Sequence, residues 1–185
     1  MLLDIKQYGD PVLRAPSAPI EHIDDALKGL AENMIETMYA AEGIGLAAPQ
    51  IGLNIQMVAI DIPEDEDPDA EPEMAIINGE EKNIRSIMPL VFINPELEPY
   101  GKTTLFAEGC LSVHGIRANV MRPERVKAKL PQLDGSTLEI DCGGLLARCL
   151  QHECDHLGGF LFTDRVSSAA KITLAKKLKK LASMR

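Results

Sequence analysis

The chain has 185 residues, of which 45% are hydrophobic, and this size and composition suit one globular domain rather than a disordered chain. Its formal net charge of −9 argues against general nucleic-acid binding, which needs a basic surface. We see no secretory signal and no run near the ~18 apolar residues of a membrane span. The expectation is therefore a cytoplasmic protein without membrane contact, whose four cysteines are thiols or metal ligands.

The N-terminal part predicts a helix that is capped by Asp24 or Asp25 and runs to about Glu42. Apolar residues recur there at helical spacing, and Gly43 is a typical helix stop. A small-residue-rich stretch, GIGLAAPQIG, follows, and it is too apolar for an ordinary solvent loop. The next segment, Ile55 to Asp61, reads as a buried strand.

The middle of the chain begins with an acidic stretch, Pro63 to Glu73, that lacks aromatic and β-branched residues. This composition predicts a solvated, mobile surface loop, which we expect to extend over about 63–88. Further short strands are expected in LVFINP, TLFAEGCLSV, RVKAKL and STLEID, with a tight turn at Leu133–Ser136.

Two more helices are predicted near the C-terminus. One runs from Leu145 to about Leu157, after two glycines, and the other covers about 167–184. Strands with helices before and after them predict an α+β fold. We expect mostly antiparallel sheets around a central helix, an N-terminal and a C-terminal helix, and a single domain over 1–185.

The central helix contains the pattern H-E-x-x-H at His152, Glu153 and His156. Residues four apart lie about 40° apart around a helix, so both imidazoles can reach one metal ion. Glu153 lies beside this face, where it can reach a water on the metal but is poorly placed as a ligand. The pattern predicts a metal site.

The third ligand is not settled by spacing. No His and no Glu follow His156, so the completions found in zinc proteases of this pattern fail. Cys154 is about 200° from His152 on the helix and points away. Cys110 could equally be a core thiol or a ligand, and His22 and His114 are further candidates.

Three segments together resemble one family. GIGLAAPQ (Gly43–Gln50), EGCLS (Glu108–Ser112) and QHECDH (Gln151–His156) occur in the order of the signature motifs of the peptide deformylases, of the bacterial type 1-like group. The resemblance extends from DPVLR near the N-terminus to the C-terminal helix. The main departure is the acidic stretch, which is longer than the usual loop of the family.

The resemblance implies that Cys110, His152 and His156 bind one divalent metal ion, with water in the fourth position. It implies Fe²⁺, with Zn²⁺ or Ni²⁺ as substitutes, and a site of one sulfur and two nitrogens suits all three.

The same resemblance implies a hydrolase that removes the formyl group from N-terminal formylmethionine of nascent polypeptides and releases formate. A metal-bound hydroxide would attack the formyl carbon, with Glu153 as general base and then acid. The side chain of Gln50 and the backbone N–H of Leu111 are the implied donors to the oxyanion.

A substrate cleft is implied along the first motif, where the substrate would pair as an added strand and Gly45 would allow close approach. For Arg148 we expect an aliphatic stem that forms a wall, with the charged end in solvent. The residues implied near the substrate are Ile44, Gly45, Glu108, Gly109, Arg117, Leu145, Arg148 and Cys149.

The C-terminal helix carries five lysines around an apolar stripe, Lys171, Lys176, Lys177, Lys179 and Lys180. Either the stripe simply docks on the domain, or the helix also contacts the ribosome, where nascent chains emerge. Two other functions stay open at this point, a metallopeptidase and a non-enzymatic metal-binding or thiol-sensing protein.

Overall fold

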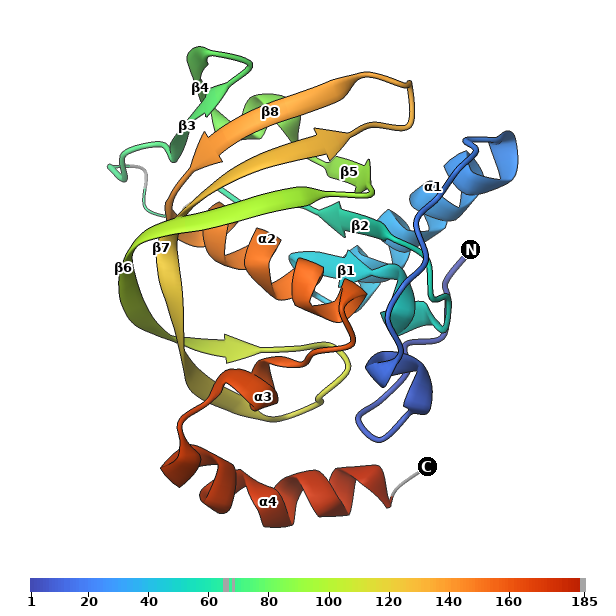
Figure 1. Cartoon of the computed structure of the whole chain (residues 1–185), viewed down its shortest axis with the longest axis vertical. Coiled ribbons are helices and arrows are strands. Elements are labelled where there is room, and N and C mark those ends of the chain that lie inside the picture. The colour runs from blue at the N-terminus through green and yellow to red at the C-terminus, as the bar shows by residue number, and fades with distance from the viewer. Residues whose placement is uncertain (65–66, 68, 184–185) are drawn as a thin grey trace.

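The computed structural model describes residues 1–64, 67 and 69–183. Helix α2 (Gly144–Leu157) runs through the middle of the molecule, with strands on both sides of it (Figure 1). It packs against β1 (Gly45–Ala47), β2 (Met57–Ile60) and β7 (Arg117–Pro131). The remaining strands are β3 (Met74–Ile77), β4 (Glu80–Asn83), β5 (Leu90–Ile93), β6 (Glu96–Gly109) and β8 (Thr137–Cys142).

The strands form two antiparallel sheets. The smaller has the order β1-β2-β5, and the larger has the order β4-β3-β8-β7-β6. The long β6–β7 hairpin carries the chain from the larger sheet down past the end of α2 (Figure 1). The predicted α+β architecture with mostly antiparallel pairing is confirmed.

Helix α2 is central because ten of its residues are buried, five of them apolar and five polar or charged. Leu146, Ala147 and Leu150 are buried in the main core, against residues of both sheets. The residue at the N-cap position of α2 is Gly143, which has no side chain to cap the helix. Instead, Oε1 of Glu73 accepts a hydrogen bond from the backbone N–H of Leu146 at 3.1 Å. A residue of the acidic stretch therefore caps the central helix.

Helix α1 (Asp25–Ala40) begins as predicted, since the side chain of Asp24 accepts a hydrogen bond from the N–H of Leu27 at 2.8 Å. Its buried residues include Met34 and Met38, which pack on the smaller sheet. The helix ends two residues before the predicted Glu42, which has a φ of 55° and cannot continue it.

The prediction of a surface loop over 63–88 is wrong for its second half. Strands β3 and β4 form a hairpin there, followed by the 3₁₀ helix η3 (Ile84–Ile87). The turn is Asn78-Gly79, with φ values of 50° and 84°, and Ala75 and Ile77 face inward. Residues 65, 66 and 68 lie outside the described residues, and the rest of 63–73 contains no helix or strand.

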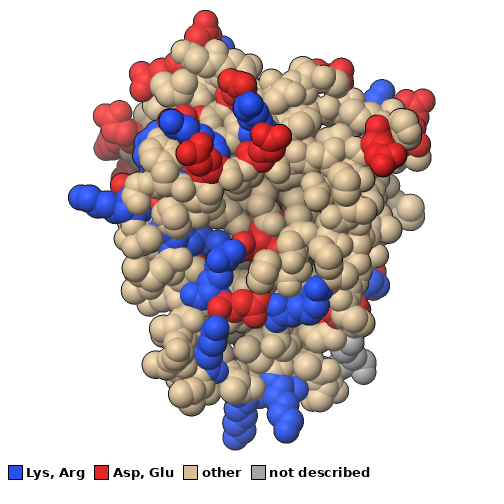
Figure 2. Space-filling view, in the orientation of Figure 1, with Lys and Arg blue, Asp and Glu red and all other residues tan. Residues whose placement is uncertain are grey.

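The C-terminal region consists of the short helix α3 (Phe162–Arg165) and helix α4 (Ser168–Ala182), which lies along one end of the molecule (Figure 1). Leu174 packs into a second core with Leu13, Val120 and Phe162. All five lysines of α4 are exposed, and Lys and Arg side chains project from this end in Figure 2. Residue 184, the predicted end of the helix, lies outside the described residues.

Two 3₁₀ helices, η1 (Pro11–Arg14) and η2 (Ala48–Ile51), complete the fold. None of the helices in the described part of the chain has the length and hydropathy to span a membrane.

Candidate metal centre

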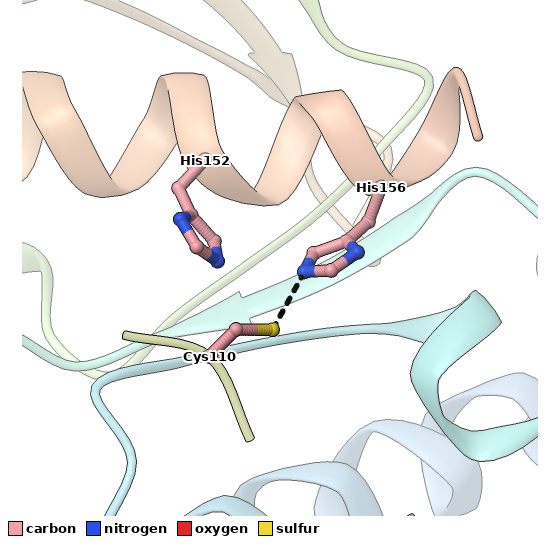
Figure 3. A group of neighbouring side chains, drawn as sticks. All are labelled: Cys110, His152 and His156. Carbon is pink, nitrogen blue, oxygen red and sulfur yellow. Dashed lines mark hydrogen bonds between the residues drawn. The ribbon is translucent and has the colours of Figure 1, made fainter. Parts of the chain in front are cut away.

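The structure brings three side chains from two distant parts of the sequence together. His152 and His156 project from neighbouring turns of α2, and Cys110 faces them from the end of β6 (Figure 3). Sγ of Cys110 lies 3.3 Å from Nε2 of His156. The three ligand atoms all lie within 4.8 Å of one another. Their residues are largely shielded from solvent, with His152 9% and His156 1% exposed.

This arrangement fits a metal ion. Bonds of about 2.0–2.3 Å in a tetrahedral site place neighbouring ligand atoms roughly 3.3–3.8 Å apart, which the Cys110–His156 distance matches. One thiolate and two imidazoles suit Zn²⁺ and other divalent transition metals. Among the residues that the structure describes, this is the one group of three or more such side chains close enough to hold an ion.

A buried carboxylate orients one of these histidines. Oε2 of Glu108 lies 2.9 Å from Nδ1 of His152, which leaves Nε2 to face the metal position. Glu108 also accepts hydrogen bonds from Nε and Nη2 of Arg122, at 2.6 and 2.9 Å. It accepts a further one from Nη1 of Arg148 at 2.8 Å. Burial opposes ionisation of Glu108, but hydrogen bonds from His152 and Arg122 outweigh it and hold its pKa well below the usual value.

The carboxylate of Glu153 is buried beside the metal position. The residue is 4% exposed, and its Oε2 has no hydrogen-bond partner among the described residues. Burial raises the pKa of Glu153 to about 7. It packs directly on Gly45, where an added Cβ would lie 2.8 Å from the carboxyl carbon. An unpaired buried carboxyl of this kind is suited to accept a proton from water.

The side chain of Gln50 is held in one orientation. Its Oε1 accepts a hydrogen bond from the backbone N–H of Ala47 at 2.8 Å. The amide nitrogen therefore points toward the metal centre, 3.5 Å from Sγ of Cys110 and 3.3 Å from Oγ of Ser112. Leu111 follows Cys110 in the same turn, so both predicted oxyanion donors lie next to the ligand cluster.

A cavity of about 890 Å³ opens onto this cluster. All the predicted site residues line it except His156, which is buried behind them. The predicted residues in its wall are Ile44, Gly45, Gln50, Glu108, Gly109, Cys110, Leu111, Arg117, Leu145, Arg148, Cys149, His152 and Glu153. His114 is also in the wall rather than among the ligands.

Comparison with known proteins identifies the family. The sequence model of the polypeptide deformylase family matches residues 2–171. The chain belongs to this family. A peptide deformylase of Novosphingobium aromaticivorans is 46% identical over 181 residues, which cover 96% of each chain.

Solved structures agree. A peptide deformylase of Legionella pneumophila, 36% identical, superposes with a TM-score of 0.80 over all of this chain and 97% of the other. A deformylase of Synechococcus elongatus, solved in complex with actinonin, is 39% identical with a TM-score of 0.79, over 97% of this chain and 85% of the other. The chain is thus an enzyme of a family that removes N-formyl groups from nascent polypeptides and uses a metal ion.

For Arg148, the expected position of the charged end in solvent is wrong. This residue of the deformylase is 9% exposed, and its guanidinium binds inward. Nη1 donates to Glu108 at 2.8 Å and to the carbonyl of Val120 at 3.2 Å, and Nη2 donates to the carbonyl of Thr104 at 3.0 Å. The buried charge of Glu108 attracts the guanidinium more than solvent does.

Sequence reasoning missed Arg122, which forms ion pairs with Glu108 in the site and with Asp155 on α2. Besides Glu108, it binds Asp155 at 2.8 Å, and only 3% of its side chain is exposed. A signal was present in the alternation of β7. Arg122 lies in the inward row with Val120, Val126 and Ala128, where a charge needs a buried partner.

Proposed function

We propose that this chain hydrolyses the formyl amide of an N-terminal formylmethionine on newly synthesised polypeptides in the cytoplasm, releasing formate. The observation that carries the proposal is the position of Glu153, a buried carboxyl next to the Cys110–His152–His156 cluster in an open cavity, whose Oε2 has no hydrogen-bond partner among the described residues. Family membership supports the reaction class, and this geometry supports the roles of the individual residues.

The metal is the first part of the proposal. Cys110, His152 and His156 would hold one divalent ion, with Fe²⁺ expected first and Zn²⁺ or Ni²⁺ as substitutes. When bound, such an ion supplies Lewis acidity and lowers the pKa of a coordinated water. The cluster offers three protein ligands, so a four-coordinate ion would keep one coordination position for water or substrate.

The proton transfers are assigned to Glu153. It accepts a proton from the attacking water as the new C–O bond forms at the formyl carbon. It then gives that proton to the amine nitrogen as the C–N bond breaks, so that formate and a free N-terminus result. The amide N–H of Gln50 and the backbone N–H of Leu111 donate to the oxyanion that forms between these steps. Losing one such donor typically costs roughly 10²–10³ in kcat.

Substrate binding is assigned to the edge of the smaller sheet. β1 is an edge strand of that sheet, and Ile44 and Gly45 line the cavity at this position. An extended peptide can add there as a further strand. Ile44, Leu145 and Cys149 give the cavity an apolar side that suits a methionine side chain.

A formate-release assay tests the proposal. Metal-loaded protein is incubated with formyl-Met-Ala-Ser, with its acetylated form and with the free peptide, and metal content is measured after anaerobic purification. We expect formate from the first peptide alone and no internal cleavage, and internal cleavage would favour a metallopeptidase. Glu153→Gln should abolish turnover while the metal stays bound. An unchanged rate would favour a non-enzymatic metal-binding protein.

The proposal also includes a partner other than the substrate, the ribosome, which helix α4 would contact. The five exposed lysines of α4 contrast with the acidic rest of the chain, and Leu174 fixes the helix to the domain. Replacing Lys176, Lys177, Lys179 and Lys180 with Glu keeps the docked face intact. These changes should abolish co-sedimentation with ribosomes at low salt, and unchanged co-sedimentation would contradict the proposal.

A further inference from the structure

The segment Ile5–Tyr8, close to the N-terminus, connects the two parts of the chain that carry the proposed oxyanion donors. The backbone N–H of Lys6 donates to the carbonyl of Gln50 at 2.7 Å. The backbone N–H of Tyr8 donates to the carbonyl of Ser112, also at 2.7 Å. The two donor groups come from distant parts of the sequence, and this segment fastens both.

The side chain between these two bonds makes a third. Nε2 of Gln7 donates to the carbonyl of Leu111 at 3.0 Å and lies 3.4 Å from the carbonyl of Ile5. Because both neighbours are acceptors, the NH₂ group must face them. Oε1 of Gln7 is buried and has no partner among the described residues, so the hydrogen bonds of this side chain are those that its NH₂ group donates to Leu111 and Ile5.

The bond from Gln7 completes the fixation of Leu111. The carbonyl of Cys110 accepts a hydrogen bond from the N–H of Val113 at 3.0 Å, which holds the peptide group before Leu111. The carbonyl of Leu111 is held by Gln7, which fixes the peptide group after it. The N–H of Leu111 belongs to the first of these peptide groups, and the bond from Gln7 keeps the next group from turning against it. Gln7 and Leu111 both line the cavity.

We infer that Gln7 is a positioning residue for the deformylation reaction, which holds the carbonyl of Leu111 so that the N–H of Leu111 points at the oxyanion. This inference rests on the proposed function. Gln7 acts through Leu111 and touches no reacting atom. A preorganised donor needs no reorientation during the reaction, and a donor free to turn loses part of its effect.

The size of the expected effect follows from that reasoning. Complete loss of an oxyanion donor costs roughly 10²–10³ in kcat, and loosening a donor costs less, on the order of tenfold to a hundredfold. Because the bond acts in the transition state, kcat and kcat/KM should fall together while KM stays the same. Cys110, His152 and His156 are untouched, so metal content should not change.

Four substitutions, Gln7→Met, Gln7→Glu, Gln7→His and Gln132→Met, test the inference on the metal-loaded full chain with formyl-Met-Ala-Ser. Gln7→Met keeps the length of the side chain and removes the donor, whereas Gln7→His keeps an N–H donor. Gln132→Met is the matched control, because Nε2 of Gln132 also donates to a backbone carbonyl, that of Leu130, on a hairpin away from the cavity. We measure kcat, KM, metal content and amide hydrogen exchange over residues 110–113.

We expect Gln7→Met to lower kcat with KM and metal content unchanged and to speed exchange over 110–113. Gln7→His should recover most of the rate, and Gln132→Met should match the wild type. A wild-type kcat in Gln7→Met would overturn the inference alone. So would a lowered kcat accompanied by metal loss in both Gln7→Met and the equally long Gln7→Glu, since that marks a purely structural role. A wild-type protein that releases no formate would overturn the proposed function itself.

Discussion

Nδ1 of His152 and Oε2 of Glu108 lie 2.9 Å apart, so a strand residue sets the orientation of a proposed metal ligand on the central helix. The contact also determines which ring nitrogen of His152 is free for the metal. Arg122 and Arg148 also bind Glu108, and the hydrogen bonds from His152 and Arg122 keep it ionised despite burial. The candidate metal site is therefore built by packing α2 against the β6–β7 hairpin as much as by the motif on α2.

The first prediction concerns the Glu108→Gln substitution, which removes the negative charge of this side chain. Glu108→Gln still offers an oxygen to His152, but it removes the counter-charge of the buried Arg148 and leaves Arg122 with Asp155 alone. We expect metal affinity to fall by about 10–100-fold, measured by competition with a chelator. Glu139→Gln, an exposed change on β8, is the control. Equal affinities of both variants and wild type would contradict the role of Glu108.

The second prediction distinguishes two cysteines. Cys110 faces both histidines, whereas Cys154 sits on α2 between them, packs against the main core and has its pKa raised by burial. Cys110→Ser should sharply lower the number of metal ions per chain and the activity. Cys154→Ala should keep both, because it removes only a small packed side chain. If metal content fell equally in the two variants, the assignment of the ligand would be wrong.

Features with local causes could be predicted from the sequence. The start of α1 follows from Asp24, whose side chain caps the helix, and the helical repeat of α2 alone places His152 and His156 on one face. Cys110 had no such signal, because only the path of β6 brings it to α2. Its choice as a ligand depended on the resemblance to the family, and the geometry agrees with that choice.

Contacts among several elements could not be predicted. The buried group of Glu108, Arg122 and Arg148 joins two strands and a helix, and no sequence spacing encodes it. Gly45 is a second example. The sequence suggested room for a substrate backbone, but the neighbour that excludes a side chain there is the carboxyl of Glu153. Such details depend on which side chains meet after the sheets have formed.

The third prediction follows from that contact. In Gly45→Ala the new Cβ would lie 2.8 Å from the carboxyl carbon of Glu153, so the carboxyl must move. Because a displacement of about 1 Å can cost on the order of 10²-fold, we expect kcat to fall by that amount with the metal retained. Gly29→Ala is the control. It lies in α1 with open space around it, and should keep full activity while raising thermal stability slightly.

The fourth prediction concerns pH and the capping of α2 by Glu73. Burial raises the pKa of Glu73 above its usual 4.5, although the N–H groups of Leu146 and Leu145 oppose the shift. The folded chain therefore binds this proton more tightly than the unfolded chain does. The stability that Glu73 contributes is fully present below pH 4.5 and is lost as pH rises through the higher folded pKa.

Glu73→Gln tests this, because its amide oxygen can still accept from Leu146 but cannot ionise. The variant should gain stability relative to wild type as pH rises from about 4 to about 8, by less than ~1.4 kcal/mol because the side chain is only half buried. Urea unfolding of both metal-loaded proteins across this range gives the difference directly. A difference that stays constant with pH would show that Glu73 titrates alike in the folded and unfolded chains. A gain toward low pH would show that the capping hydrogen bonds outweigh burial.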